Sequence, residues 1–277
     1  MFRRDRSFSL ARPLRLLLGA PLLASLLTGC GLFGSSTPGD PTRMSEAEFD
    51  VAADLWWRQH DPREALKHAL RAAELDTDNA DAAHLVSLIY LDFCQNSQID
   101  ECRLGEAETY AKRAITAKRD YIEAQNTLAV IYIHQKRPAD AIRMLEPITE
   151  NILYATPEIA WGNLGWAYLE KGDSEHAISA LRRAVAAQPL FCVGNYRLGV
   201  AYHHVGQLES SRDALDRALE TDAPGCGNLQ DAYLERARVH LALGELEMTR
   251  ADLDRCIVLQ KTNQAGRACG RMLTTLQ

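Results

Sequence analysis

The feature that most constrains this chain is a pattern of small and large apolar residues that recurs about every 34 residues. Its clearest copy, at residues 158–191, contains Trp161, Leu164, Gly165, Tyr168, Gly172, Ala177, Leu181, Ala184 and Pro189. Two short helices packed as a hairpin explain this spacing. The small residues lie where the helices approach closely, the large ones fill the gaps, and Gly172 permits the turn. The pattern therefore predicts a chain built from paired helices.

Further copies occupy five segments, namely 46–79, 80–121, 122–155, 192–225 and 230–263. The copy at 80–121 has about eight additional residues at its turn, and the last copy matches the pattern at fewer positions. The spacing W-x2-L-G-x2-Y, then A-x3-L, then P, resembles the tetratricopeptide repeat. This resemblance implies an all-α, right-handed superhelix of six helix hairpins over residues 45–263. We expect residues 264–277 to form a helix that caps the exposed apolar end of the array.

The N-terminal segment has the features of an export signal. Five arginines within residues 1–15 precede a short apolar stretch at 16–27, too short to span a bilayer comfortably. The sequence Leu27-Thr28-Gly29-Cys30 then resembles the lipobox of bacterial lipoproteins. The resemblance implies cleavage after residue 29 and a lipid anchor of three acyl chains on Cys30. The alternative is an ordinary signal peptide followed by a chance cysteine.

Residues 30–44 are rich in Gly, Ser, Thr and Pro, which predicts a flexible tether after the lipidated cysteine. In lipoproteins an aspartate directly after the cysteine usually retains the protein in the inner membrane. Gly31 stands there instead, so we expect an outer-membrane lipoprotein that faces the periplasm.

The charge distribution argues against a nucleic-acid partner. The formal net charge of the chain is −6, but residues 1–29 contain five arginines and one aspartate, so the remainder carries −10. Binding to phosphates requires clustered lysines and arginines. We expect no nucleic-acid binding by this acidic body.

Six cysteines remain besides Cys30, an even number that suits disulfides in an oxidising compartment. Proximity in the sequence suggests that Cys94 pairs with Cys102, Cys192 with Cys226, and Cys256 with Cys269. Each disulfide would cross-link the chain at a place where the array of repeats is irregular or ends. The rival interpretation is a zinc site or a catalytic thiol, but the sequence contains no CxxC pair.

No residue pattern predicts catalysis, a metal or a cofactor. His203 and His204 are adjacent, and neighbouring helix residues point about 100° apart, so they are poorly placed to chelate one metal. His204 is better suited to line a groove. The sequence contains no GxSxG, HExxH or phosphate-binding glycine-rich loop. We therefore expect a binding scaffold that is not an enzyme and uses no cofactor.

The first helices of tetratricopeptide repeats line a concave surface, and an apolar stripe falls on those positions here. This predicted groove stripe consists of Trp57, Leu88, Leu91, Val130, Ile133, Trp166, Leu169, Tyr196, Val200 and Leu234. An exposed contiguous apolar surface suits an amphipathic helix or an extended apolar segment of a partner. The alternative is that the superhelix buries some of these residues, or that the cap or tether covers them.

The lipobox, the tether, six repeats and a capping helix together resemble the PilF/PilW/Tgl family of type IV pilus biogenesis lipoproteins, and most closely the myxobacterial Tgl branch. The resemblance implies a monomeric pilotin that brings secretin subunits to the outer membrane and promotes their assembly into multimers. A second possibility is a general periplasmic adaptor for outer-membrane protein assembly or for cell-wall hydrolases.

Overall fold

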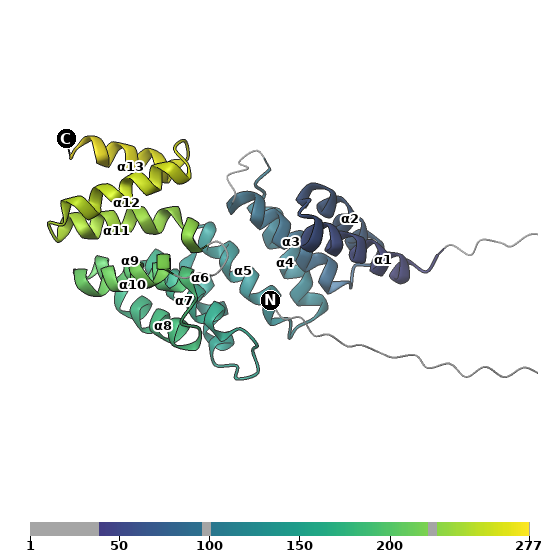
Figure 1. Cartoon of the computed structure of the whole chain (residues 1–277). Helices are drawn as coiled ribbons and strands as arrows, with labels where there is room; N and C mark the ends of the chain where they lie inside the picture. The colour runs from purple at the N-terminus through teal and green to yellow at the C-terminus, as the bar shows by residue number, and fades with distance from the viewer. Residues whose placement is uncertain (1–38, 96–100, 221–225, 277) are drawn as a thin grey trace, which may run out of the picture. The chain divides into compact units, whose positions relative to one another are not determined.

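The computed structural model describes residues 39–95, 101–220 and 226–276, and within these ranges the chain forms helices and no strand (Figure 1). The α-helices are α1 (Pro41–Asp54), α2 (Pro62–Leu75), α3 (Ala80–Gln95), α4 (Leu104–Ala117), α5 (Ile122–His134), α6 (Pro138–Thr149), α7 (Pro157–Lys171), α8 (Ser174–Ala187), α9 (Cys192–His204), α10 (Leu208–Glu220), α11 (Gln230–Ala242), α12 (Leu246–Leu259) and α13 (Gln264–Thr274). A π-helical turn, η1 (Leu55–Gln59), continues α1, and a 3-10 turn, η2 (Cys226–Asn228), precedes α11. None of the described helices is both long enough and apolar enough to cross a bilayer.

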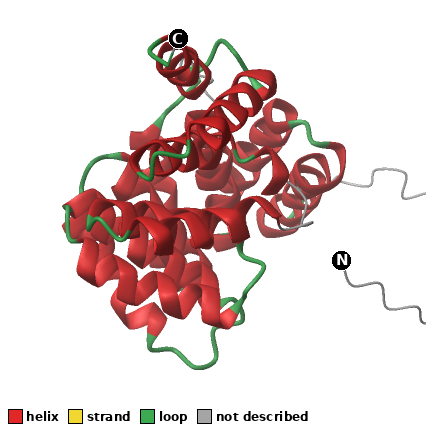
Figure 2. Cartoon of the chain, turned by 60° about the vertical axis from the view of Figure 1, so that its left-hand side comes forward, coloured by secondary structure: helices red, strands yellow, loops and turns green. Residues whose placement is uncertain are grey.

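Consecutive helices pack in pairs, and each pair packs on the next (Figures 1 and 2). Each of the six predicted repeats contains one such pair, from α1 with α2 to α11 with α12. Helix α13 packs on α12 and also contacts α11, which is the position predicted for a cap. The fold is the all-α tetratricopeptide superhelix that the repeat pattern predicts.

Close approach of the two helices within a repeat depends on glycine. A Cβ atom on Gly165 of α7 would come within 2.4 Å of Cγ of Leu181 on α8. Likewise, a Cβ atom on Gly199 of α9 would lie 2.5 Å from Cγ of Leu215 on α10. The absent side chains let leucines from the second helices fill the space between paired helices, and both leucines are fully buried. The turn after α7 requires a different property of glycine, because Gly172 has a φ of +82°.

The start of the array differs from the prediction. Residues 41–44 were expected to belong to the flexible tether, but α1 begins at Pro41. The side chain of Asp40 accepts a hydrogen bond from the backbone N–H of Thr42 at 3.2 Å, and proline at the first helical position is already fixed in a helical φ. Local capping thus extends the first helix. The predicted signal peptide, Cys30 and tether residues 30–38 lie outside the described residues.

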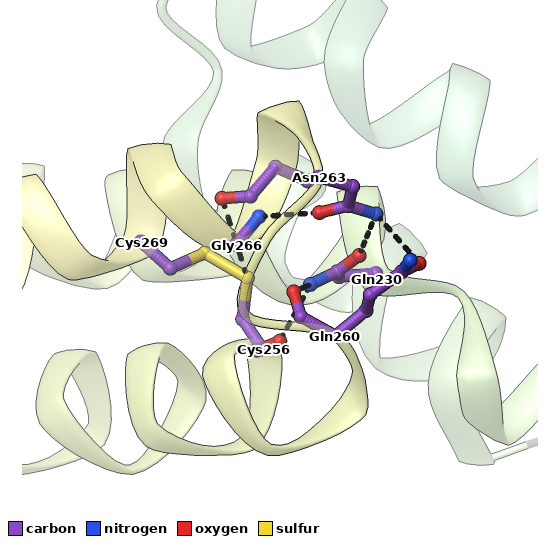
Figure 3. Close-up of a disulfide and its surroundings, with 7 residues drawn as sticks. Gln230, Cys256, Gln260, Asn263, Gly266 and Cys269 are labelled. Carbon is purple, nitrogen blue, oxygen red and sulfur yellow. Dashed lines mark hydrogen bonds between the residues drawn. A yellow bond between two sulfur atoms is a disulfide. The ribbon is translucent and has the colours of Figure 1, made fainter. Parts of the chain in front are cut away.

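Three disulfides join the cysteine pairs that sequence proximity suggests. Cys94 near the end of α3 bonds to Cys102 before α4, and Cys192 at the start of α9 bonds to Cys226 in η2. Cys256 on α12 bonds to Cys269 on α13, with 6.3 Å between their Cα atoms (Figure 3). Each bridge therefore spans an insertion, an irregular connection between repeats, or the terminal cap.

Candidate partner-binding site

An apolar cavity lies between the first helices of the fourth, fifth and sixth repeats, and we call it the Trp166 pocket. It has a volume of about 400 Å³. Its lining consists of Trp166, Leu169 and Glu170 of α7, Val193, Tyr196, Arg197, Val200 and His204 of α9, and Leu229 and Asp231 at the start of α11. Because helical residues three, four and seven apart share one side, a single face of α9 supplies half of this lining.

The helices that form the pocket contact one another directly. Helix α7 packs against α9, and α9 against α11, so that the first helices of successive repeats are neighbours. The ring of Phe191 fills the space beside two glycines, since a Cβ on Gly162 or Gly194 would come within 2.6 Å or 2.5 Å of that ring. The two glycines, one on α7 and one on α9, thus allow an aromatic ring to pack between these helices.

Trp166 is held from both neighbouring repeats. The imidazole of His134 on α5 makes an edge contact with the indole, with 5.1 Å between ring centroids. The guanidinium of Arg197 on α9 lies over the same indole, 4.4 Å from its centroid. Burial lowers the pKa of His134, which favours a neutral imidazole near pH 7. These contacts fix one large aromatic side chain at the base of the pocket.

Arg197 also belongs to a polar chain that links three repeats. Its Nη1 donates to the carbonyl oxygen of Gly162 and to Oδ1 of Asn163, each at 3.1 Å. Asn163 in turn donates through Nδ2 to Oδ1 of Asn126 on α5, at 3.2 Å. Burial of the guanidinium lowers the pKa of Arg197 to about 10, so the side chain keeps its positive charge at neutral pH.

The structure brings together only part of the predicted groove stripe. Trp166, Leu169, Tyr196 and Val200 line the Trp166 pocket, and His204 lies with them as the sequence suggested. Burial raises the pKa of the Tyr196 hydroxyl, which keeps it protonated. The exposed apolar surface at this site is therefore confined to the C-terminal half of the array.

Four members of the stripe are buried, which corrects the prediction that they face a partner. Leu91, Val130 and Ile133 lie in the hydrophobic core around α5, and Ile133 is only 1% exposed. Leu234 lies in the core of the last repeat beneath α13. Neighbouring repeats pack closely enough to cover these positions, as the alternative interpretation allowed.

The two N-terminal members do not join the pocket. Trp57 is 64% exposed, but it lies on the π-helical turn η1 after α1, several repeats away in the array. Leu88 on α3 is half-buried. In these two repeats the first helices therefore provide no continuation of the Trp166 pocket.

The predicted groove stripe does not include five residues that line the pocket, namely Glu170, Val193, Arg197, Leu229 and Asp231. For Arg197 the sequence contains a signal, because it is a single charged residue within the apolar face formed by Val193, Tyr196 and Val200. The described residues contain no cluster of three or more His, Cys, Asp or Glu side chains suited to hold a metal ion. His203 pairs instead with Glu235 of α11, with 2.6 Å between Nδ1 and Oε1.

Comparison with known proteins identifies the fold. Family models described as tetratricopeptide repeats match residues 99–152, 153–190 and 163–225. The repeat-containing protein PA0015 of Pseudomonas aeruginosa is 38% identical over 60 residues, which cover 22% of this chain. The chain spans 57% of the length of that relative.

Solved structures cover much more of the chain. PilW, a type IV pilus biogenesis factor, is similar with a TM-score of 0.67 and 21% identity, over 84% of this chain and 98% of PilW. PilF of Pseudomonas aeruginosa has a TM-score of 0.63 and 12% identity, over 84% of this chain and 99% of PilF. A tetratricopeptide repeat protein from Parabacteroides merdae has a TM-score of 0.65 and 14% identity, over 87% of this chain and 86% of that protein. The chain therefore has the tetratricopeptide-repeat fold, in an arrangement similar to those of PilW and PilF.

Proposed function

We propose that this protein is a pilotin of the type IV pilus machine. It is a monomeric lipoprotein, anchored in the outer membrane through Cys30 and facing the periplasm. It binds secretin subunits in the Trp166 pocket and promotes their localisation and multimer assembly. It acts as a scaffold without enzymatic activity or cofactor, and its assignment to the Tgl branch stays a prediction.

The observation that carries this proposal is the composition of the Trp166 pocket. Leucine, valine, tryptophan and tyrosine side chains from α7 and α9 line a cavity in which the described residues leave them half-buried. Such a surface between helices suits an apolar or amphipathic segment of another protein. The overall likeness to PilW, a type IV pilus biogenesis factor, supports a role in pilus biogenesis, and the secretin subunit is the source that we propose for that segment.

The test replaces Trp166 by alanine. Trp161 provides a matched control, because it lies on the same helix, is also half-buried, and is also stacked by an arginine, Arg183, at 4.6 Å. Trp161 lines a different cavity, together with residues of α6 and α8. Loss of a central aromatic from an interface commonly costs about 2 kcal/mol or more, which is roughly thirtyfold in affinity.

We expect Trp166→Ala to abolish heat-resistant secretin multimers on a gel and Trp161→Ala to leave them near the wild-type level. Circular dichroism and the amount of lipidated protein in outer membranes would verify that both variants fold and are exported. Normal multimers with a folded Trp166→Ala variant would rule out the pocket as the working surface. If deletion of the whole protein left secretin multimers intact, the role of a general periplasmic adaptor would be favoured instead.

A further inference from the structure

The guanidinium of Arg197 lies at the Trp166 pocket without a carboxylate partner among the described residues. Its Nη1 donates both of its hydrogen bonds within the chain, to Gly162 and Asn163. In the described part of the structure, Nε and Nη2 of Arg197 have no hydrogen-bond acceptor, and neither takes part in an ion pair. The side chain thus offers two neighbouring donors, in the geometry that binds a carboxylate through both oxygens.

The carboxylates that line the same pocket interact with other cations. Glu170 accepts from Nζ of Lys136 at 2.7 Å. Burial raises the pKa of Asp231, and the nearby charge of Arg238 acts in the opposite direction. Neither carboxylate forms an ion pair with Arg197 in the described structure. Arg197 therefore keeps a positive charge that no carboxylate of the described residues neutralises through an ion pair.

Arg197 differs in this respect from Arg236, a half-buried arginine of α11. Arg236 forms ion pairs with Asp216 at 2.8 Å and Asp252 at 2.7 Å. Removing a cation from water without a counter-charge is unfavourable, and an acidic group that enters the pocket would offset that cost. The charge and the apolar lining together describe a site for a group that is both apolar and acidic.

The neighbouring cavity indicates whether the acidic group is a side chain within a peptide or the carboxylate at its C-terminus. A second cavity, of about 540 Å³, shares Asp231 with the Trp166 pocket and extends to α13. Arg271 of α13 lines this second cavity and is exposed, with no described ion-pair partner. Because Asp231 lines both cavities, they are neighbours, and a bound segment of several residues would extend from one towards the other. An internal acidic side chain fits this course better than a C-terminal carboxylate does.

We propose that the Trp166 pocket binds a peptide segment in which an Asp or Glu side chain neighbours a large apolar side chain. The apolar side chain packs on Trp166, Tyr196 and Val200, while the carboxylate accepts hydrogen bonds from Nε and Nη2 of Arg197. This inference rests on the proposed function and specifies the chemistry of the secretin segment that the pocket recognises.

The test uses an array of short peptides that tiles the secretin subunit of the same organism, beside a set of random-sequence peptides. The full exported protein, purified in detergent, is applied to the array as wild type, Arg197→Met or Arg183→Met. Arg183 is the matched control, since it also stacks on a tryptophan, but it is exposed and lies outside the pocket. Each bound peptide is then synthesised with its acidic residues changed singly to the amides, and with a free or amidated C-terminus.

We expect the wild type and Arg183→Met to select secretin peptides with an acidic residue beside a large apolar residue. Changing that acid to its amide should weaken binding at least about tenfold in the wild type and little in Arg197→Met. Amidation of the C-terminus should have no effect. Arg197→Lys keeps the charge but loses the paired donors, so it should bind with intermediate affinity, and it replaces Arg197→Met if that variant does not fold.

The outcomes separate this inference from the proposed function. Secretin peptides that bind equally well as acids and amides would overturn the role of Arg197 while leaving the pilotin function intact. Binding lost on C-terminal amidation would overturn the internal acidic residue. If no secretin peptide binds, but random peptides show the acidic preference that Arg197→Met removes, the pocket chemistry stands and the secretin assignment fails. Absence of that preference in both peptide sets would overturn the inference.

Discussion

His84 is an example of a polar residue whose state depends on burial. It lies on α3 with an exposed fraction of 9%, and its ring nitrogens contact the hydroxyl of Tyr121 at 3.1 Å and Oγ1 of Thr127 at 2.9 Å. Burial lowers the pKa of His84 to about 4, although the charges of Glu123 and Asp81 act to raise it. The imidazole is therefore neutral in the folded protein near pH 7.

We expect this histidine to make the fold sensitive to mild acid. Because the folded-state pKa lies below the unfolded value, the unfolded chain binds more protons between these two values, and stability falls as the pH decreases. Between pH 7 and pH 5 the contribution of His84 should fall by roughly 2 kcal/mol. Urea unfolding of the wild type and of His84→Gln at both pH values measures this change in the free energy of unfolding. Equal losses in the two proteins would contradict this assignment of the pKa.

At the scale of one element, α13 shows how the array ends. Asn263 caps this helix, because its Oδ1 accepts from the N–H of Gly266 at 2.8 Å, while its Nδ2 donates to Gln230 and Gln260 (Figure 3). Gln230 of α11 donates in turn to the carbonyl oxygens of Cys256 and Gln260, both at 2.6 Å. The turn before α13 is thus bonded to both helices of the last repeat.

Two glycines on α13 should respond oppositely to alanine. A Cβ on Gly266 would lie 1.9 Å from the carbonyl oxygen of Gln260, whereas a Cβ on Gly270 would meet nothing within 4 Å. Gly266→Ala should therefore displace the capped turn and lower stability by about 1–3 kcal/mol. Gly270→Ala should raise stability by up to about 1 kcal/mol, because alanine favours the helix. Thermal and urea unfolding compare the two variants, and a stable Gly266→Ala protein would refute the tight packing.

The bridge between Cys256 and Cys269 should stabilise the same element. On the chain-entropy model, closing a sequence separation of 13 residues contributes about 3 kcal/mol. The double variant Cys256→Ser with Cys269→Ser should lose most of this stability, and hydrogen exchange should show earlier opening of α13. Non-reducing peptide mapping checks the pairing in the exported protein. Free thiols at these positions, or unchanged exchange in α13, would argue against the bridge.

At the scale of the whole molecule, the repeats divide into regions with different roles. Leu91, Val130 and Ile133 of the second and third repeats are buried in the core, whereas helices of the fourth to sixth repeats line the Trp166 pocket. In an array each repeat packs mainly on its neighbours, so a substitution at the pocket leaves the packing of distant repeats unchanged. This separation should allow binding to be weakened without loss of the fold, on which the comparison of Trp166→Ala with Trp161→Ala depends.

The proposed anchor is a property of the whole exported chain. Cys30→Ala should prevent lipidation and leave the protein in the soluble periplasmic fraction or as an uncleaved precursor, since multi-chain lipid anchors hold proteins on a membrane almost permanently. Labelling with a fatty-acid probe and fractionation of the envelope provide the measurement, and Cys269→Ala serves as a control cysteine change. Equal labelling of the wild type and Cys30→Ala would exclude Cys30 as the anchor.

Local sequence determined most of the architecture of this protein. Helix starts follow from capping residues such as Asp61 and Asp173, turns from residues such as Gly172, and helix pairing from small residues such as Gly165 and Ala177. Two of the cysteine pairs join neighbouring segments of the chain, and the third, Cys192 with Cys226, spans the length of one repeat. These features depend on residues within one repeat or its direct connection, so spacing alone predicts them.

Which first-helix residues remain accessible depends on the packing between repeats. Ile133 and Tyr196 both belong to the predicted groove stripe, yet one is buried in the core and the other lines the pocket. The difference depends on which side chains of neighbouring helices cover each position, because Ile133 packs in the core around α5 and Tyr196 borders a cavity between α7, α9 and α11. The charge of Arg197 is likewise visible in the sequence, but whether the described side chains of the neighbouring repeats give it a carboxylate partner is a property of the packing. The exposure of a side chain and the pairing of its charge depend on contacts between residues that are distant in the sequence. A periodic pattern describes residues within one repeat, so it does not predict these contacts.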